Sequence, residues 1–549
     1  MKPLVRAVFL FLLLENFFFT IAEANDPTSS SFDVTQYDIS IAFDLQTKTL
    51  TGRVLLTATS LQSTNEVIFN ASPVTLTIDS VFWGNKNLLI KQEQDVVHAL
   101  LPVQLEQHTA FELAIYYHGM ARFDGRYDSG GVYIPDSVHF TRLFTSSEPT
   151  FARCWWPCKD SPSDKAPVRM HVTVPDNLIA ASNGLLRKVE KKNGLATYHW
   201  ETHYPIATYL VSLAVAPYIE QDDIYTSMSG EQMPITYYVY PNDTAKARID
   251  FQNIKNMLRF LSDKFGEYPF IKEKFGIAEV DGNTTMENQT LCSIQTDLIT
   301  GKQRGELTFL HEMAHHWWGD LVTPTTWNHT WLSEGFAQYT EALYLEHTKG
   351  IDAYRSYINR LMAPRMGAYA GSIIGKSDTA FWDSFAGRVY FKGALVLHML
   401  RGIVRDSLFF SIMKQYANDP AFRYGNARTE DFVRVCEKTS TQPLQWFFNE
   451  WVYATTDSID RPVYEYAWTV DSSHNNNISL TIEQPYAEKL LYRMPFRLSV
   501  WSNGTEQFFP VVDSLPIQNF SLNAVGKVDS LNIDRDGWVF KSMKKKEKF

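Results

Sequence analysis

The chain has 549 residues, which is too long for one hydrophobic core and predicts roughly two to four domains. Apolar residues make up 45% and aromatic residues 14%, so the chain can bury large cores and is not disordered. A net charge of −10 argues against a nucleic-acid partner and favours a soluble protein.

The first 24 residues have the pattern of a cleavable export signal. Lys2 and Arg6 precede an apolar stretch, and Ala-Glu-Ala at positions 22–24 fits a small-x-small cleavage site. Glu15 interrupts the stretch, which makes it too broken to span a bilayer stably. We therefore expect an exported protein, periplasmic or secreted, with no stable membrane span after signal removal. An uncleaved anchor is the alternative.

Residues 25–219 predict an antiparallel β-sheet domain. Apolar and polar residues alternate in YDISIAFDL, TGRVLLTATS, MHVTVP and TYLVSLAVAPY, and turn residues separate these runs. The period then changes: KARIDFQNIKNMLRFLSDKFG has apolar residues at helical spacing and ends at Gly266. A strand-like FGIAEV follows, and helical patterns dominate from about residue 305 to 455. Residues 220–455 are thus expected to form a second, mainly helical domain.

Alternation returns towards the end of the sequence. NISLTIEQ, FRLSVWSN, QFFPVV and SLNID predict a small β-sandwich at residues 456–541. We expect the basic residues 542–549 to form a frayed, solvated tail. The four cysteines allow three full disulfide pairings, and buried free thiols are the alternative.

The sequence HEMAHHWWGD at residues 311–320 has a metal-binding pattern. His311 and His315 are four residues apart, so both imidazoles lie on one face of a helix and can reach one ion. His-Glu-x-x-His is the zincin signature, and a surface helix with incidental histidines is the alternative. Glu312 and His316 each lie about 100° around the helix from the adjacent ligand. We expect Glu312 to act as a general base on water and His316 to pack elsewhere.

A third metal ligand is expected from a second helix. Glu334 stands nineteen residues after His315 and opens an amphipathic pattern in WLSEGFAQYTEALYLE. It would complete a His₂Glu set, which zinc hydrolases use together with an open position for water. Glu341 lies two turns later on the same face. It either orients a ligand histidine or is an ordinary solvated carboxylate.

The stretch HEMAHHWWGDLVTPTTWNHTWLSEGFA closely resembles the core signature of the aminopeptidase N family of zinc metallopeptidases, which includes leukotriene-hydrolase-like members. The resemblance covers nearly the whole mature chain and implies one Zn²⁺ per chain. It also implies a multidomain α+β fold with an N-terminal antiparallel β-saddle, a thermolysin-like, mainly helical catalytic domain and a small C-terminal β-sandwich. The long helical C-terminal domain of many relatives is not expected.

The family's exopeptidase motif Gly-x-Met-Glu-Asn resembles TTMEN in this chain. Met286, Glu287 and Asn288 match, while Thr284 replaces the glycine. The resemblance implies that Thr284, Thr285, Met286, Glu287 and Asn288 bind substrate, and that this stretch pairs with the peptide backbone as an added edge strand. Glu287 would hold the terminal ammonium; an ordinary surface glutamate is the alternative.

Two further segments resemble the same family. SSEPTFARCWWPCKD matches an upstream Gln-Phe-Glu-Pro motif, with Glu148 as a second ammonium-binding carboxylate and Ser146 where a glutamine is usual. VYFKGALVLHML matches a Tyr-x-Lys-Gly segment and gives Tyr390 as a hydrogen-bond donor to an oxyanion. A turn glutamate and a core tyrosine are the respective alternatives.

Together these residues predict a zinc-dependent aminopeptidase that hydrolyses the N-terminal residue from peptides with a free N-terminus. Zinc would polarise the scissile carbonyl and acidify a water molecule, and Glu312 would take the proton. Glu148 and Glu287 would fix the distance from the ammonium to the metal. The alternatives are an epoxide hydrolase or dual-function relative, and a non-catalytic zinc-bound binding protein.

Overall fold

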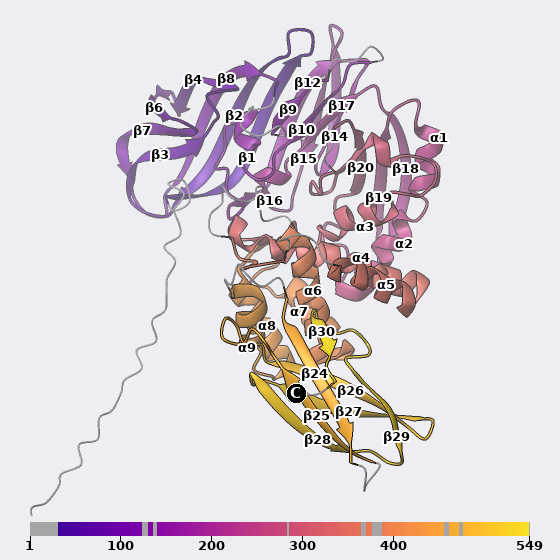
Figure 1. The fold of residues 1–549 in the computed structure, drawn as a ribbon. Helices are drawn as coiled ribbons and strands as arrows, with labels where there is room; N and C mark the ends of the chain where they lie inside the picture. The colour runs from indigo at the N-terminus through magenta and orange to yellow at the C-terminus, as the bar shows by residue number, and fades with distance from the viewer. Residues whose placement is uncertain are drawn as a thin grey trace, which may run out of the picture.

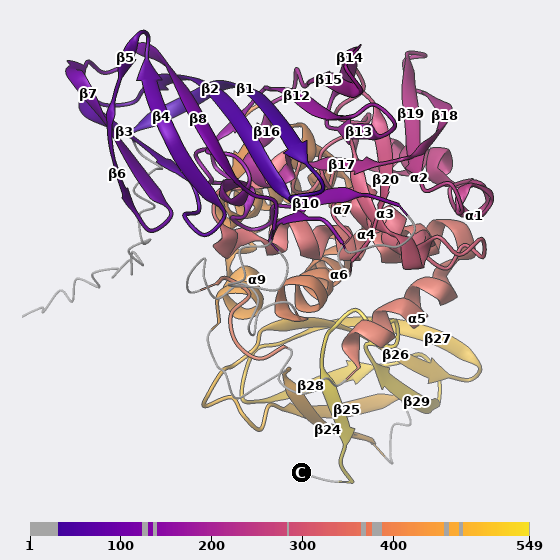
Figure 2. The same cartoon turned by 90° about the horizontal axis from the view of Figure 1, so that it is seen from above.

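The computed structural model describes residues 31–122, 130–135, 140–282, 285–363, 369–375, 387–454, 461–471 and 476–547. The expected signal segment at 1–24 and the motif residue Thr284 lie outside these described residues. Two β-rich regions lie on opposite sides of a helical middle region (Figure 1 and Figure 2). This arrangement confirms the expected multidomain α+β fold.

The first region consists of strands with a few short turns. Its strands are β1 (Phe32–Asp44), β2 (Thr49–Ser60), β3 (Thr64–Asn70), β4 (Leu76–Trp83), β5 (Lys86–Asn87), β6 (Leu89–Glu93), β7 (Val96–Leu105), β8 (Ala110–Met120), β9 (Gly131–Tyr133), β10 (Leu143–Ser146), β11 (Lys165–Ala166), β12 (Val168–Pro175), β13 (Ile179–Ser182), β14 (Leu185–Lys192), β15 (Leu195–Glu201), β16 (Ile206–Ala207) and β17 (Leu213–Ala216).

An eight-stranded sheet in the order β14-β15-β12-β1-β2-β8-β4-β5 forms the body of this region. Buried and less buried residues alternate along β1 and β2, so one face of the sheet carries the core. The sheet is mixed, because β1 pairs parallel with β12 while its other neighbour, β2, is antiparallel. A second sheet has the order β13-β17-β10-β9, and its strand β10 ends two residues before Glu148.

The run TYLVSLAVAPY forms less strand than its alternation predicted. Only Leu213–Ala216 pairs in a sheet, because residues 208–210 form a 3-10 turn. In this turn the Val211 N–H donates to the Thr208 carbonyl at 3.2 Å. The Thr208 hydroxyl also donates to the Asp160 carboxylate at 3.0 Å. A local side-chain bond therefore competes with strand pairing here.

The middle region is mainly helical. Its elements are β18 (Ile219–Thr226), β19 (Gln232–Val239), α1 (Thr244–Asp250), α2 (Ile254–Phe265), β20 (Phe275–Val280), β21 (Cys292–Gln295), α3 (Glu306–Ala314), β22 (Val322–Pro324), α4 (Trp331–Lys349), α5 (Ile351–Met362), the π-helix η6 (Arg388–Lys392), α6 (Gly393–Val404), α7 (Asp406–Asn418), β23 (Gly425–Ala427), α8 (Thr429–Ser440), α9 (Gln445–Phe448) and the π-helix η7 (Asn449–Tyr453).

The helix predicted to end at Gly266 is interrupted once. α1 ends at Asp250, whose carboxylate accepts the backbone N–H groups of residues 300, 301 and 303 at 2.6–2.7 Å. This long-range contact fixes the chain at the interruption, and α2 begins at Ile254. Gly266 then ends α2 with a φ of 110°, a left-handed value that glycine adopts without strain.

The last region contains two sheets that form a small sandwich. Its strands are β24 (Val463–Val470), β25 (Asn477–Glu483), β26 (Met494–Ser502), β27 (Thr505–Asp513), β28 (Ile517–Asn523), β29 (Val528–Ile533) and β30 (Ser542–Lys545). The sheets have the orders β28-β25-β24-β30 and β27-β26-β29.

The expectation of a frayed tail at residues 542–549 is wrong for its described part. β30 pairs parallel with β24 over four residues. The Lys546 ammonium lies 3.2 Å from Glu483 and also pairs with Glu465. Carboxylates on β24 and β25 therefore neutralise part of a basic run that looked unpartnered in the sequence.

No helix in the described part of the chain is both long enough and apolar enough to cross a membrane. All four cysteines are buried free thiols, so the structure shows none of the possible disulfide pairings.

His398 on α6 connects the helical region to the last region. The Tyr354 hydroxyl donates to its Nδ1 at 2.7 Å, and its Nε2–H donates to the Gly537 carbonyl at 2.8 Å. Both bonds require the neutral ring, because Nδ1 can accept only when it is unprotonated. Burial lowers the pKa of His398 to about 4; the hydrogen bond to Gly537 opposes this shift, and the charge of Arg401 adds to it.

Acidification should therefore destabilise this connection. A histidine whose folded pKa lies below its unfolded value of 6.5 contributes fully above pH 6.5 and loses that contribution as the pH falls to about 4. We expect a loss of about 3 kcal/mol in the free energy of unfolding over that window. His398→Asn should remove this component in chemical denaturation between pH 4 and 7.5. The exposed His108→Asn should leave the curve unchanged, and parallel wild-type and His398→Asn curves would contradict the assignment.

Candidate metal centre and active site

Two helices bring the three candidate metal ligands together. His311 lies in the last turn of α3, and His315 caps that helix with helical backbone angles. The His315 N–H donates to the His311 carbonyl at 3.2 Å, which keeps the two side chains on one face. Glu334 lies in the first turn of α4 and is 3% exposed.

The spacing of the three donor atoms fits one tetrahedral ion. Oε2 of Glu334 lies 3.4 Å from His311 Nε2 and 3.3 Å from His315 Nε2. Bonds of about 2.0–2.1 Å to zinc in tetrahedral geometry place ligand atoms about 3.3 Å apart. Two imidazoles and one carboxylate are also the donor set of catalytic zinc sites. The residues present therefore fit a zinc ion.

Partners on the far side of each ring orient the two histidines. His311 Nδ1 donates to Glu341 Oε1 at 3.0 Å, and His315 Nδ1 donates to the Trp318 carbonyl at 3.0 Å. A carboxylate and a carbonyl only accept, so Nδ1 carries the proton in both rings. Each Nε2 lone pair then points at the shared position. This arrangement is typical of metal-ligating histidines.

A close contact between two glycines fixes the helix that supplies Glu334. A Cβ on Gly335 would lie 2.9 Å from the Gly393 Cα, and a Cβ on Gly393 would lie 3.0 Å from the Gly335 Cα. α4 and α6 therefore approach each other at a point directly next to Glu334. Any side chain at either position would separate the helices and move the ligand.

Charges in this site stabilise a cation. Burial opposes ionisation of Glu334, but His315 and His311 lower its pKa to about 2, so it is charged at neutral pH. Burial also opposes a charged His315, yet the Glu287 and Glu334 carboxylates raise its pKa to about 10. A bound metal dication would balance the same carboxylate charges and leave both imidazoles neutral.

His316 lies outside the metal site. Its Nδ1 lies 2.9 Å from the Tyr268 hydroxyl oxygen, and its Nε2 lies 3.4 Å from the Cys292 thiol. The side chain is fully buried, and burial followed by the charge of His315 lowers its pKa to about 3. It packs in the core behind the ligand helix.

The described part of the exopeptidase motif is extended and has two faces. Met286 forms two backbone bonds with Ser293, at 2.9 and 2.8 Å, as an isolated antiparallel bridge. Successive side chains therefore alternate, which places Thr285 and Glu287 on one face and Met286 on the other. Donor atoms of Glu287, Glu312 and His315 lie within 4.8 Å of one another. The face with Thr285 and Glu287 is thus the one beside the metal ligands.

The side chains of two motif residues, Met286 and Asn288, lie within the protein, and their expected contact with substrate stays a prediction. Met286 is buried, and Asn288 is 1% exposed. The Ser293 hydroxyl donates to Asn288 Oδ1 at 2.9 Å, and Asn288 Nδ2 donates to the Leu210 carbonyl at 3.4 Å. Both side chains hold the loop, because the alternation points them into the protein.

The N-terminal region supports this loop from behind. Asn183 Nδ2 donates to the carbonyls of Gln289 at 2.6 Å and Leu210 at 3.0 Å. The Gly184 N–H also donates to the Thr290 hydroxyl oxygen at 2.8 Å. The motif is therefore held between the first β-rich region and β21.

Two further carboxylates lie next to the metal ligands. Donor atoms of Glu148, Glu287 and Glu334 all lie within 4.8 Å of one another. Burial, then the charges of Glu287 and Glu334, raises the pKa of Glu148 well above its usual range. Burial also raises the pKa of Glu287 to about 7, with Glu334 and Glu312 adding to the effect. A cation placed between these acids would relieve their repulsion.

Tyr390 lies on the π-helix η6 at the edge of the site. Its ring is nearly parallel to that of His311, with centroids 6.0 Å apart. Burial, followed by the charges of Glu334 and Glu148, raises the pKa of its hydroxyl well above the usual value. The hydroxyl is therefore protonated at neutral pH and can donate a hydrogen bond.

Several supporting residues escaped the sequence analysis. Ser333 Oγ lies 2.9 Å from His315 Nδ1 and donates to the Trp318 carbonyl at 2.8 Å. Gln338 and Tyr357 both donate to the Glu341 carboxylate at 2.8 Å. The position of Ser333 directly before Glu334 was the available signal. Tyr357 lies on another helix, and no spacing rule connects it to the site.

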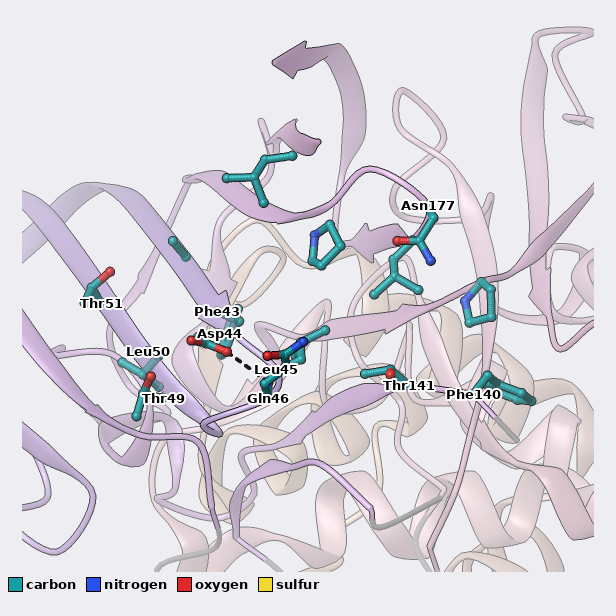
Figure 3. Close-up of a pocket in the computed structure, with 15 residues that line it drawn as sticks. Phe43, Asp44, Leu45, Gln46, Thr49, Leu50, Thr51, Phe140, Thr141 and Asn177 are labelled. Atoms are coloured by element: carbon teal, nitrogen blue, oxygen red, sulfur yellow. Dashed lines mark hydrogen bonds between the residues drawn. The ribbon is translucent and has the colours of Figure 1, made fainter. Parts of the chain in front are cut away.

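A cavity of about 910 Å³ lies elsewhere, in the N-terminal region (Figure 3). Phe43, Asp44, Phe140 and Asn177 are among its lining residues, and the Gln46 N–H donates to Asp44 at 2.9 Å. None of the lining residues belongs to the His and Glu cluster, so this cavity is separate from the candidate site.

A His₂Glu donor set beside an unligated glutamate places the site in the class of zinc-dependent hydrolases. Comparison with protein families agrees with this class. Residues 249–451 match the peptidase family M1 domain, and residues 34–210 match the peptidase M1 N-terminal domain. The chain belongs to peptidase family M1.

Curated relatives share part of their length with this chain. Glutamyl aminopeptidase of Sus scrofa is 28% identical over 448 residues, covering 76% of this chain and 46% of the relative. The enzyme of the same name in Rattus norvegicus is 30% identical over 332 residues, covering 56% of this chain and 34% of the relative. The chain thus spans between about a third and a half of these relatives.

Solved structures also share the fold. A variant of a two-domain M1 zinc metallopeptidase bound to L-tryptophan has a TM-score of 0.68 and 25% identity, covering 78% of this chain and 95% of that one. Aminopeptidase A of Legionella pneumophila, in complex with aspartic acid, has a TM-score of 0.80 at 18% identity and covers 95% of this chain and 60% of that one. The second similarity concerns the fold alone.

Proposed function

We propose that this protein is a zinc-dependent aminopeptidase that removes the N-terminal residue from peptides. One observation carries the proposal: the Glu148 and Glu287 carboxylates lie within 4.8 Å of the metal ligand Glu334. A site for endopeptidase cleavage has no need of two acids at that distance. A free α-ammonium satisfies both of them, since a buried carboxylate pair repels itself without a cation.

Each step of the proposed hydrolysis can be assigned to particular residues of this chain. A zinc ion held by His311, His315 and Glu334 supplies Lewis-acid polarisation of the scissile carbonyl and acidifies water. Glu312 takes a proton from the attacking water and returns it to the leaving amine. The Tyr390 hydroxyl donates a hydrogen bond to the developing oxyanion.

The motif backbone also suits a bound peptide. The Met286 N–H and carbonyl are used by Ser293, so in an extended chain the backbone groups of Thr285 point to the opposite edge. An extended peptide can pair there as an added strand. Such pairing aligns the substrate while the carboxylates hold its first residue.

Relatives support the same activity. The similar curated proteins from Sus scrofa and Rattus norvegicus are named glutamyl aminopeptidases. Two structures of a two-domain M1 zinc metallopeptidase variant contain free amino acids, L-tryptophan in one and L-arginine in the other. Free amino acids are the products that aminopeptidase action releases.

The proposal is tested with a panel of aminoacyl amides, each with a free or an acetylated N-terminus. We expect hydrolysis of the free amines, loss of hydrolysis on acetylation, and inhibition by a zinc chelator that added Zn²⁺ reverses. Glu287→Gln should lower kcat/KM for free amines by about 10- to 100-fold, because it removes a charged hydrogen-bond partner of the ammonium.

Glu220→Gln, on the exposed edge strand β18, is the matched control and should keep the wild-type rate. Equal cleavage of acetylated and free substrates would overturn the exopeptidase assignment. Hydrolysis that survives complete metal removal would overturn the metallohydrolase assignment.

Export is also part of the proposal. The basic start, apolar stretch and Ala-Glu-Ala site within residues 1–24 support a periplasmic or secreted location. Sequencing the N-terminus of protein recovered outside the cytoplasm should give a start near Asn25, whereas an intact Met1 on such protein would contradict cleavage.

A further inference from the structure

A hydrogen bond joins the exopeptidase motif to the proposed general base. The Thr285 hydroxyl donates to Glu312 Oε1 at 2.9 Å. Glu312 is 6% exposed, and its carboxylate lies within the group that also contains Glu287 and His315. Within the described residues, this is the side-chain hydrogen bond that the structure shows for the Glu312 carboxylate.

The backbone explains why Thr285 reaches the base. The bridge between Met286 and Ser293 fixes the extended stretch, and side chains two residues apart in such a stretch share one face. Thr285 and Glu287 thus face the same side. One supplies a hydroxyl to the base, and the other supplies a carboxylate for the substrate's ammonium.

The bond restricts a side chain that otherwise has several rotatable bonds. Oε1 of Glu312 is held by Thr285, which leaves Oε2 to accept a proton from water. A general base must lie within about 2.6–3.2 Å of the proton it removes, so a rotated carboxylate is ineffective even when it is present. Fixing such a group beforehand lowers the cost of reaching the reactive geometry.

We propose that Thr285 is a positioning residue for Glu312, acting through its hydroxyl in the peptide hydrolysis proposed above. The role rests on that proposed function and goes beyond the substrate contact expected for the motif. It couples the segment that binds the substrate's N-terminus to the group that activates water. It also gives this chain a hydroxyl donor at a motif position whose neighbours bind substrate or pack in the core.

A purely structural role for the hydroxyl is disfavoured by other contacts. The loop is already fixed by the two Met286–Ser293 backbone bonds and by the bond from Asn183 to the Gln289 carbonyl. Asn288 adds a bond to Leu210. Loss of one hydroxyl at Thr285 therefore leaves the path of the loop determined.

Three substitutions separate the hydroxyl from the methyl group of Thr285. Thr285→Val keeps the shape and removes the donor, Thr285→Ser keeps the donor and removes the methyl, and Thr285→Ala removes both. We expect valine and alanine to lower kcat by about 10- to 100-fold with KM within about threefold of wild type. Serine should recover most of the lost kcat. If kcat of the valine variant stays close to wild type and kcat of the serine variant is low, the shape of the side chain matters rather than its hydroxyl, and the proposal is wrong.

A double-mutant cycle tests whether the effect passes through the base. In a Glu312→Gln background, Thr285→Val should lower the residual rate by less than about threefold, because no general base remains to be positioned. A full additional loss would show that Thr285 acts elsewhere. Thr296→Val is the matched control, since the Thr296 hydroxyl donates to Glu279 at 2.5 Å outside the site. It should leave kcat unchanged.

A structural readout separates this inference from the activity itself. Crystal structures of the metal-free proteins should show the Glu312 carboxylate in one orientation in the wild type and in Thr285→Ser. In the valine variant it should rotate or occupy several orientations. Zinc content and thermal stability should stay unchanged. If the wild-type protein fails to hydrolyse the aminoacyl amides, the proposed function is refuted, but these structures still test the positioning role of Thr285. A Glu312 carboxylate that keeps its orientation in the valine variant would refute that role.

Discussion

Glu312→Gln is expected to lower kcat by about two to four orders of magnitude while the protein still binds one zinc ion. Glutamine keeps the size of the side chain but cannot accept a proton at neutral pH. Glu312 lies outside the His₂Glu donor set, so the three ligands remain intact. Steady-state rates on aminoacyl amides, together with zinc content by atomic emission, measure both parts of the result.

Glu306→Gln is the matched control, because it makes the same chemical change in the first turn of the same helix. It should retain wild-type turnover. A Glu312→Gln enzyme with near wild-type kcat would remove Glu312 from its role as the base. Loss of zinc from that variant would instead show that Glu312 supports the metal.

Glu334→Ala is expected to abolish tight zinc binding and with it nearly all turnover. The substitution removes one of three protein donors and leaves two imidazoles, which make a much weaker site. Zinc should fall well below one per chain after dialysis against a weak chelator, and kcat should drop by at least about a thousandfold. Competition with a chromogenic chelator gives the zinc affinity directly.

His347→Ala, an exposed histidine near the end of the same helix, should keep both zinc and activity. The comparison excludes a general effect of altering α4. Retention of tightly bound zinc by Glu334→Ala would assign the third ligand to another residue.

The metal site was the most predictable part of the molecule. Four-residue spacing on a helix is a local property, so the shared face of His311 and His315 followed from the sequence alone. The sequence left open whether Glu341 orients a ligand histidine or is an ordinary solvated carboxylate, and the bond from His311 to Glu341 supports the orienting role. Glu334 was expected from its position at the start of a second amphipathic pattern, and the family resemblance carries the same spacing.

The exopeptidase motif shows where sequence reasoning stopped. Its residue types matched the family, but the faces of Met286 and Asn288 depend on pairing with Ser293, a contact across a turn. The hydroxyl bond from Thr285 to Glu312 depends on how β21, which pairs with the motif, packs against α3. Such contacts arise from tertiary structure, which spacing along the chain does not encode.

The interrupted helix and the paired C-terminal segment have the same explanation. Asp250 stops α1 where it binds a loop fifty residues later, and Lys546 finds its acids on two other strands. Local periodicity and charge runs identify helices and strands, but distant partners decide where those elements end.

The position of Glu148 on the first β-rich region has a wider consequence. The metal donors belong to the helical region. Glu148, one of the two acids beside them, belongs to the first β-rich region, which also supports the loop carrying Glu287. In the proposed function, selectivity for chain ends would therefore depend on how the first β-rich region packs against the helical region. A fragment starting near residue 220 would contain the three zinc donors but lack Glu148 and the bonds that Asn183 and Gly184 make to the motif loop.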